Sequence, residues 1–304
     1  MYQSQFHSIW QDEAAVLSAP DSYALEFFEP PRALSSLITT FFFFRSDEPW
    51  LRDCQPANTG YMMIFLSGEA QARFSSGLAA PSQPVSLIGP TNAAMQYVVR
   101  GPLTVLGCAF TPLGWRAVTD MSAIESCDQF IDTQQLFGPQ VDDLHRDLSA
   151  ALDIAPDIER CDRLIDIVCG FLLPRLSEIP ARHVEIVAAV LRWLDQSITP
   201  DVEALYASLP VARRQAQRII GDYFGCAPKQ LMRKYRAVRA AMLLNDPACS
   251  DEQAVQVQEL FYDQPHMIRE IRHFAGRTPS RLSGGDGTLL SMWLDKENIR
   301  ELRQ

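Results

Sequence analysis

The sequence predicts an α+β protein, in which a β-rich N-terminal domain precedes an all-α domain that carries two helix-turn-helix modules. Short apolar runs bounded by Gly and Pro occupy residues 23–118, which is typical of strands. Apolar residues spaced three and four apart dominate the chain after them, which is typical of amphipathic helices. Two similar helix-turn-helix patterns also follow one another between Asp201 and Leu282. We therefore expect strands within about residues 20–115 and helices beyond them.

The N-terminal runs are short and rich in Phe, Val and Ile, so they predict the strands of a compact β barrel or sandwich. They are Ser36–Phe44, Tyr61–Leu66, Val85–Ile88, Gln96–Val99 and Leu103–Phe110. Gly89–Pro90 and Gly101–Pro102 lie between runs and are expected to end regular structure. The stretch Phe41–Phe44 predicts a core strand that is buried on both faces.

Helical patterns follow the β-rich region. They cover Trp115–Met121, Gly138–Leu152, a longer segment after Pro156, and Val184–Trp193. Two interpretations of the helices in residues 136–180 stay open. They either close the core of the N-terminal domain or also form a dimer interface, because an apolar helix face fits both roles.

Each helix-turn-helix pattern consists of a short helix, a tight turn and a basic amphipathic helix that ends at a Gly. In the first pattern the short helix and turn cover Leu205–Val211, the basic helix covers Ala212–Ile220, and the pattern closes on Phe224–Pro228. In the second, the short helix and turn cover Val257–Gln264, the basic helix covers Pro265–Phe274, and the pattern closes on Ala275–Pro279. In both patterns a Pro follows the Gly after two intervening residues. Gly suits the position after a helix end and Pro suits the first helical turn, so both patterns have a marked end.

Charge is distributed unevenly along the chain, whose net charge is −10. Residues 1–181 hold 10 basic and 22 acidic side chains, whereas residues 182–283 hold 14 basic and 11 acidic ones. The region of the two modules is therefore the net-positive part of an acidic protein. That polarity favours contact with phosphate.

Other function classes lack their usual sequence signals. No run reaches the roughly 18 apolar residues of a membrane helix, and residues 1–20 do not have the pattern of a signal peptide. The seven cysteines are scattered without Cys-x-x-Cys spacing, which predicts reduced thiols, no zinc site and a cytoplasmic location. None of the five histidines lies between residues 8 and 144, so no metal site is expected in the β region. Because nucleophile elbows, phosphate loops and nucleotide fingerprints are missing, we expect neither an enzyme nor a bound cofactor. Glu69 with Arg73 or Arg100 either lines a pocket or forms a surface pair.

Several motifs of the C-terminal region resemble those of the AraC/XylS family of transcriptional regulators. In the first half the resemblance rests on Arg214-x-x-x-Arg218, Gly225–Pro228, Arg236-x-x-x-Ala240 and Leu243–Leu244. In the second half it rests on Phe261–His266, Arg269–Arg272 and Gly276–Pro279. More loosely, Gly107–Gly114, Pro30–Leu34 and Gly89–Pro90 resemble the sensor domain of one branch of that family. The resemblance implies a cupin-like N-terminal barrel and a C-terminal double helix-turn-helix domain that binds DNA.

In this family the second helix of each module lies in the major groove, and a long central helix sets the modules one helical turn apart. By position, the resemblance assigns base reading to Arg214, Gln217 and Arg218 in the first module and to Gln264, His266 and Arg269 in the second. The first three share a helix face, and Arg and Gln can each bind a base through two hydrogen bonds. The resemblance assigns phosphate contacts to Arg213, Arg272 and Lys229.

The sequence departs from the family pattern at five positions of the modules, which are Tyr206, Pro210, Ala212, Ala216 and Leu260. Pro210 and Leu260 replace turn glycines. A positive φ costs Leu on the order of 1 kcal/mol and is inaccessible to Pro, so the first turn must differ in shape. Ala212 replaces a capping Ser, which costs roughly another 1 kcal/mol. These departures leave open a drifted family member that has lost specific DNA binding and acts through protein–protein contacts.

The sequence therefore predicts a one-component, DNA-binding transcriptional regulator in four parts. Residues 1–135 form a β-rich domain that senses a small molecule or mediates assembly, 136–180 a helical linker, 181–283 the AraC-type domain, and 284–304 a hinge and a C-terminal helix. The expected partners are promoter DNA, a small and largely apolar effector, a second copy of the chain, and RNA polymerase if the protein is an activator. The last helix, Thr288–Leu302, follows the flexible composition of Ser283–Gly287 and packs either on the body or on a partner chain.

Overall fold

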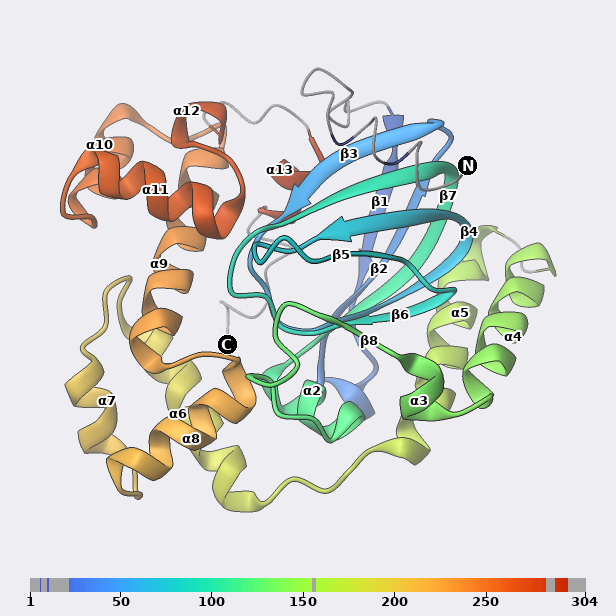
Figure 1. Ribbon diagram of the computed structural model, residues 1–304, viewed down its shortest axis with the longest axis horizontal. Helices are drawn as coiled ribbons and strands as arrows, with labels where there is room; N and C mark the ends of the chain where they lie inside the picture. The colour runs from blue at the N-terminus through green and yellow to red at the C-terminus, as the bar shows by residue number, and fades with distance from the viewer. Residues whose placement is uncertain (1–5, 7–9, 11–21, 155–156, 283–287, 295–304) are drawn as a thin grey trace.

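The computed structural model describes Phe6, Trp10 and residues 22–154, 157–282 and 288–294. It confirms the predicted fold class, with an antiparallel sheet in the N-terminal region and helices in the C-terminal region. The strands are β1 (Ala24–Phe28), β2 (Ile38–Ser46), β3 (Trp50–Gln55), β4 (Tyr61–Arg73), β5 (Ala79–Pro81), β6 (Val85–Ile88), β7 (Met95–Phe110) and β8 (Phe130–Ile131). Their order is β1-β2-β7-β4-β6-β8, with β3 paired to β7 and β5 to β4. The sheet curves around an apolar interior, and this curved sheet is called the barrel below (Figure 1).

Strand β7 corrects the expectation that Gly101–Pro102 ends a strand, because it runs through both residues. Its first part pairs with β3 and its second part pairs with β2. Pro102 has no N–H to donate, and it lies where β7 changes partners, so the ladder tolerates it. A Cβ on Gly101 would lie 2.1 Å from the Glu48 carbonyl oxygen, so the close approach of these two backbone segments requires glycine at position 101.

Two short elements also depart from the expected boundary near residue 115. Helix α2 (Pro112–Thr119) begins before that boundary. Strand β8 lies beyond that boundary. Its two residues pair with β6 and so extend the sheet by a short edge strand. Beyond β8, the regular elements of the described chain are helical.

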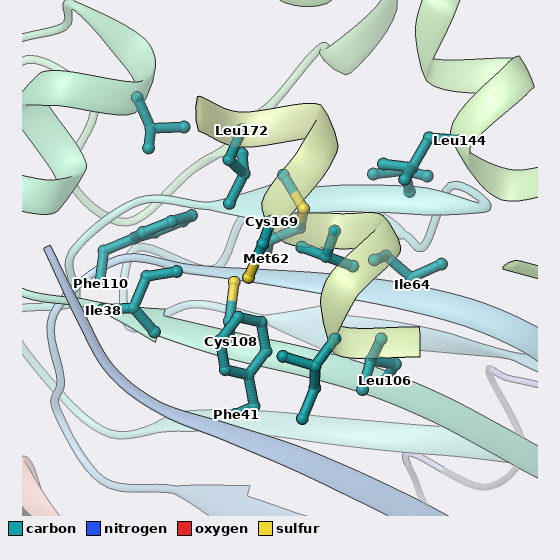
Figure 2. Close-up of a cluster of buried hydrophobic side chains, with 14 of the residues drawn as sticks. Ile38, Phe41, Met62, Ile64, Leu106, Cys108, Phe110, Leu144, Cys169 and Leu172 are labelled. Atoms are coloured by element: carbon teal, nitrogen blue, oxygen red, sulfur yellow. The ribbon is translucent and has the colours of Figure 1, made fainter. Parts of the chain in front are cut away.

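The run Phe41–Phe44 is buried on both faces of β2, as predicted. Phe41 and Phe43 join Met62 and Leu106 on the face that α4 (Gln140–Ile154) and α5 (Asp157–Leu172) cover (Figure 2). Phe42 and Phe44 lie on the opposite face, in the barrel interior. Helices α4 and α5, with the short α3 (Thr133–Phe137) before them, therefore close the core of the N-terminal region.

The C-terminal region contains two helical modules joined by one long helix (Figure 1). The first consists of α6 (Ala181–Gln196), α7 (Val202–Ser208) and α8 (Arg213–Phe224), and the second of α10 (Asp251–Glu259), α11 (Gln264–Ala275) and α12 (Pro279–Leu282). Helix α9 (Pro228–Asn245) joins them. Each module has its own apolar core, with Ile219 in the first and Ile271 in the second. Both helix-turn-helix patterns of the sequence are thus present in the structure.

The turns that lack the family's glycine adopt ordinary backbone conformations. Leu260 has a φ of −70° and a ψ of −13°, so the strain expected at this residue does not occur. Pro210 is not among the residues with positive φ. Ala212 lies at the N-cap of α8 without a side-chain cap, as expected. Asp263 caps α11 by accepting a hydrogen bond of 2.7 Å from the His266 N–H.

Helix α13 (Leu289–Trp293) is the last described element and covers part of the predicted Thr288–Leu302 helix. It packs on the body of the chain, between β3 and the second module (Figure 1). The predicted hinge Ser283–Gly287 and the residues after 294 lie outside the described residues. A search of the described helices finds none that is long and apolar enough to cross a membrane.

Candidate nucleic-acid interface

Helix α8 presents the three base-reading candidates of the first module on its solvent face. Arg214, Gln217 and Arg218 are exposed, whereas Ala216 and Ile219 are buried in the module core. The helix takes this orientation because its apolar residues repeat at intervals of three and four. The structure therefore brings these three side chains together near the start of α8.

Two of the arginines of α8 form ion pairs with acidic side chains nearby. Arg213 donates hydrogen bonds of 2.6 and 2.8 Å to Glu203 of α7 and lies 4.3 Å from the centre of the Tyr206 ring. The hydrogen bonds to Glu203 raise the pKa of Arg213. Arg218 forms an exposed ion pair of 3.1 Å with Asp222. Exposed pairs are weak, so both guanidinium groups can exchange these partners for phosphate or base oxygens.

The second module presents a comparable set of side chains. Gln264, Arg269 and Arg272 are exposed on α11, and Lys229 is exposed at the start of α9. Tyr262, in the turn before α11, is 94% exposed. Sequence reasoning did not single out Tyr262, although it belongs to the Phe-Tyr-Asp-Gln-Pro-His motif that carries the resemblance. An aromatic side chain so exposed beside basic helices is a further candidate for contact with a nucleic acid.

His266 occupies a different environment from the other candidates. Its ring is half-buried and lies edge-on to Phe261, with 5.9 Å between ring centroids. Its Nδ1 faces the Tyr262 N–H at 3.4 Å, and its Nε2 is 3.9 Å from the Glu270 carboxylate. This placement favours a role in fixing the first turn of α11, and base reading by His266 stays a prediction.

Glu270 joins α11 to α9, and sequence reasoning missed this contact. Its side chain is 6% exposed and accepts hydrogen bonds from Arg233, at 2.6 and 3.1 Å, and from Arg236, at 3.4 Å. Burial is the largest single influence and raises the pKa of Glu270, but the hydrogen bonds and charge of Arg233, together with the charges of His266 and Arg236, outweigh it and hold the pKa below its usual value. Arg236 and Glu270 both lie in motifs of the resemblance, yet their pairing depends on how α9 crosses α11. The cluster fixes the orientation of α11, and with it the position of Arg269.

The barrel caps the C-terminal end of α11. This helix ends at Gly276, whose φ is 91°, and its last carbonyl groups have no partner within the helix. The backbone N–H groups of Ala57 and Ala94 donate to the carbonyl oxygens of Phe274 and His273, at 2.7 and 2.8 Å. Two loops of the barrel therefore supply the hydrogen bonds that the helix itself cannot make.

The barrel holds the C-terminal end of α8 in a similar way. The N–H of Ala123 donates to the Asp222 carbonyl oxygen at 2.7 Å, and the hydroxyl of Ser122 donates to its carboxylate at 2.9 Å. The side chain of Asn92 donates to the Gly225 carbonyl oxygen at 3.0 Å. The barrel thus touches both α8 and α11 at their C-terminal ends, away from the exposed first turns (Figure 1).

A buried ion pair strengthens the contact between the barrel and the second module. Asp53 of β3 and Arg277, which follows α11, are 2.7 Å apart, and their side chains are 0% and 6% exposed. Arg277 also donates to the Thr288 hydroxyl at 2.7 Å, and Asp53 accepts from the Leu290 N–H at 3.4 Å. The pair therefore joins the barrel, the second module and α13.

The barrel interior contains an apolar cavity of about 60 Å³. Its lining includes Phe42 and Phe65 from the sheet and Leu289 and Trp293 from α13. The part of the lining that the described residues supply has no charged side chain, and its polar members are Gln55, Ser82 and Tyr97. Burial raises the pKa of the Tyr97 hydroxyl well above its usual range, so this group stays neutral. The cavity is suited to an apolar group and offers no counter-charge to an ionic one.

The charged residues considered for a pocket lie elsewhere. Glu69 and Arg100 form an ion pair of 3.2 Å between β4 and β7, with both side chains partly exposed, as the surface-pair interpretation expects. Arg73 lies 4.2 Å from the centre of the Trp10 ring. Within the described ranges, no three His, Cys, Asp or Glu side chains come together so that they could hold a metal ion. The seven cysteines are free thiols.

Comparison of the sequence with known proteins points to transcriptional regulators. No model of a known protein family matches the chain. The chain is similar to the HTH-type transcriptional regulator GbdR of Pseudomonas aeruginosa, with 33% identity over 112 residues. This match covers 34% of the chain and 30% of GbdR, so the chain spans under a third of that relative's length.

Solved structures resemble the chain loosely. ToxT from Vibrio cholerae has a TM-score of 0.45 and 10% identity, and the match covers 86% of this chain and 97% of that one. The AraC-like transcriptional activator CuxR has a TM-score of 0.30 and 10% identity, with 77% and 90% covered. Neither score is high enough to support a conclusion about this chain.

The C-terminal region agrees with one family in its sequence and in its helices. Several of its motifs resemble those of the family, with departures at five positions, and the structure contains two helix-turn-helix modules joined by α9. The similarity to GbdR, a regulator of the helix-turn-helix type, agrees with both. By these features the C-terminal region of the chain is a double helix-turn-helix region that resembles the DNA-binding domain of the AraC/XylS family.

Proposed function

We propose that the chain is a sequence-specific DNA-binding transcriptional regulator whose barrel binds a small molecule or mediates assembly. The observation that supports this most is the pair of helices α8 and α11 at the two ends of α9, each with exposed basic side chains (Figure 1). Helix α9 has 18 residues, which gives a length of about 27 Å, close to the roughly 34 Å of one turn of DNA. Two helices joined in this way through α9 are proposed to enter successive major grooves on one side of a duplex.

The exposed side chains then divide into two groups by role. Arg214, Gln217, Arg218, Gln264 and Arg269 read bases, and Arg213, Lys229, Arg272 and Tyr262 contact the phosphate–sugar backbone. His266 supports the first turn of α11 in this proposal. Base contacts give sequence preference, whereas backbone contacts give affinity that depends on salt.

The other parts of the chain take the roles expected from the sequence. We assign sensing or assembly to residues 1–135, the helical linker to 136–180 and DNA binding to 181–283, with residues 284–304 following as the C-terminal segment. The proposed partners are promoter DNA, an apolar effector in the barrel cavity, a second copy of the chain at the outer faces of α4 and α5, and RNA polymerase if the protein activates transcription. We propose no catalytic reaction for it.

Two substitutions test the interface. Arg218→Ala should weaken binding to the specific site by roughly 1–3 kcal/mol and relax the preference at one base pair. Arg272→Ala should weaken all duplexes alike and reduce the slope of binding against salt by about one unit. Fluorescence anisotropy with duplexes from upstream of the gene and with scrambled duplexes, at several salt concentrations, measures both effects.

The control is Arg32→Ala, which removes an exposed arginine of the short 3-10 helix Arg32–Leu34, outside both modules and away from α4 and α5, and should leave binding unchanged. Circular dichroism checks that each variant is folded. If folded Arg218→Ala binds both kinds of duplex as the wild type does, the assignment of α8 to base reading is wrong. If the wild type prefers no upstream duplex at any salt concentration, the protein acts through protein–protein contacts instead.

A further inference from the structure

Helix α13 has two apolar sides that lie in two different cores. Leu289 and Trp293 line the barrel cavity. Leu290 and Leu294 are buried in the core of the second module, together with Phe274 of α11. Positions four residues apart share one side of a helix. Leu289 and Trp293 therefore form one apolar side of α13, and Leu290 and Leu294 form another. The helix therefore touches the cavity and the DNA-binding region at once.

Trp293 lines the cavity with an aromatic ring, in the way that a bound aromatic molecule would. Its ring lies edge-on to Phe27 and Phe42, with centroid distances of 5.6 and 5.0 Å and interplanar angles of 84° and 89°. Such edge-to-face pairs are favourable beyond the area they bury. Tyr97, one of the polar members of the lining, faces the same cavity. The indole therefore already makes the aromatic contacts with Phe27 and Phe42 that a bound ring in this position would make.

The space left beside Trp293 is too small for a typical ligand. The cavity measures about 60 Å³, whereas ligand sites usually measure roughly 300–1,000 Å³. The rest of the lining comes from the paired strands of the sheet and from Ser82 next to β5. Each strand is held by backbone hydrogen bonds to one or two neighbouring strands, whereas α13 is a helix of five residues outside the sheet. Of these parts, α13 is the one that can leave the cavity without breaking the hydrogen bonds of the sheet.

Polar contacts link α13 to the end of α9 and to the segment that follows α11. Asn245, the last residue of α9, donates to the Ser291 carbonyl oxygen at 2.9 Å. Arg277, directly after α11, donates to the hydroxyl of Thr288, the N-cap of α13, at 2.7 Å. Movement of α13 out of the cavity therefore changes contacts at the end of α9 and at the end of α11.

We propose that α13 is a built-in occupant of the effector site, and that an uncharged, largely apolar aromatic ligand binds there by displacing Trp293. The ligand class follows from the lining, because a carboxylate or an amine in this cavity would be buried without a counter-charge. Displacement releases the contacts of α13 with Asn245 and Arg277 and so changes how the second module is held. This regulatory consequence rests on the proposed DNA-binding function, whereas the competition for the cavity does not.

Two dyes of matched shape test the competition on the full chain. N-phenyl-1-naphthylamine is uncharged, and 8-anilinonaphthalene-1-sulfonate is its anionic counterpart. In fluorescence titrations, Trp293→Ala should bind the uncharged dye roughly tenfold or more tightly than the wild type, because the dye no longer competes with the indole. The anionic dye should gain much less, because it would bring an unpaired charge into the cavity.

Trp50→Ala is the matched control, since Trp50 is also half-buried but packs on Phe6, outside the cavity. It should bind the uncharged dye as the wild type does. The proposal is overturned if Trp293→Ala gains no affinity for that dye, whether both chains bind it equally or neither binds it. An equal gain in Trp50→Ala would also overturn it, because a general loosening of the barrel would then explain both.

A measurement on the wild type avoids dependence on the stability of any variant. The chain has five tryptophans, and labelling with 5-fluorotryptophan gives each one a fluorine NMR signal. Trp293→Phe identifies the signal of Trp293. Saturation with the uncharged dye should move this signal to the position of a solvent-exposed indole. If the signal stays in place while the dye saturates the protein, the proposal is wrong, and the DNA-binding proposal is unaffected because no DNA is present.

Discussion

Asp53 and Arg277 are opposite charges buried at the contact between the barrel and the second module. Removing one of them leaves the other buried without its partner, which costs more than the pair contributes. Arg277→Met should therefore lower the free energy of unfolding by about 3–5 kcal/mol. The double variant Asp53→Leu/Arg277→Met should lose less than Arg277→Met alone, because no charge is left buried. Urea unfolding followed by circular dichroism measures both losses.

The comparison of the single and double variants decides whether water reaches and screens the Asp53–Arg277 ion pair. If Arg277→Met costs under about 1 kcal/mol, water screens the pair as it does at a surface. If the double variant loses as much as the sum of two single variants, the residues act independently and do not join the barrel to the second module.

Gly276 is a second residue on which this contact depends. Its φ is 91°, and a Cβ there would lie 2.6 Å from the Sγ of Cys54 in β3. Gly276→Ala should cost about 1–2 kcal/mol from the backbone conformation alone, and the overlap with Cys54 adds to this. Gly170→Ala is the control, because Gly170 lies in α5 with open space around its Cβ, and it should gain about 0.5–1 kcal/mol. Shifts of the thermal midpoint in the same direction for both variants would contradict this account.

At the scale of elements, the fixation of α11 on α9 should depend on pH. Although burial raises the pKa of Glu270, the hydrogen bonds and charge of Arg233 and the charges of His266 and Arg236 together lower it in the folded chain below its value of about 4.3 in an unfolded one. The resulting stabilisation is fully present above about pH 4.3 and is lost as the pH falls through the lower, folded pKa. The stability of the wild type should therefore exceed that of Glu270→Gln at neutral pH and approach it in acid. Urea midpoints between about pH 7 and pH 3 measure this difference.

Glu259→Gln serves as the control, because Glu259 is an exposed carboxylate at the end of the neighbouring helix α10. A difference between Glu270→Gln and the wild type that stays constant down to the lowest pH would show that the charge of Glu270 does not hold α11. In that case the packing of Ile271 and Phe274 fixes the helix instead.

At the scale of the whole molecule, the barrel holds α8 and α11 at separate points. Asn92 anchors the end of α8 through Gly225, whereas Ala57 and Ala94 anchor the end of α11. Asn92→Ala removes a hydrogen bond worth about 1 kcal/mol, so the last turn of α8 should exchange its amide hydrogens roughly fivefold faster. Peptides from α11 should exchange at the wild-type rate. Hydrogen exchange followed by mass spectrometry on the full chain measures both helices in one experiment, and faster exchange in both would show a single cooperative interface.

The sequence by itself determined the kinds of element and the two modules. Gly225 and Gly276 mark the ends of α8 and α11 as predicted, because the position after a helix end is a local requirement. The exposure of Arg214, Gln217 and Arg218 on one face also followed from the sequence, because the period of a single helix decides it. Such signals lie within a few residues of the feature that they predict.

Tertiary structure decided every feature that joins distant parts of the chain. Gly101–Pro102 lies inside β7 because two neighbouring strands supply partners on either side of it, which no local rule reveals. Asp53 and Arg277 are 224 residues apart in sequence, and such a pairing leaves no periodic signal. The sequence showed that α13 is apolar. Its two sides can pack into two different cores only because the barrel and the second module are in contact, which the sequence does not reveal.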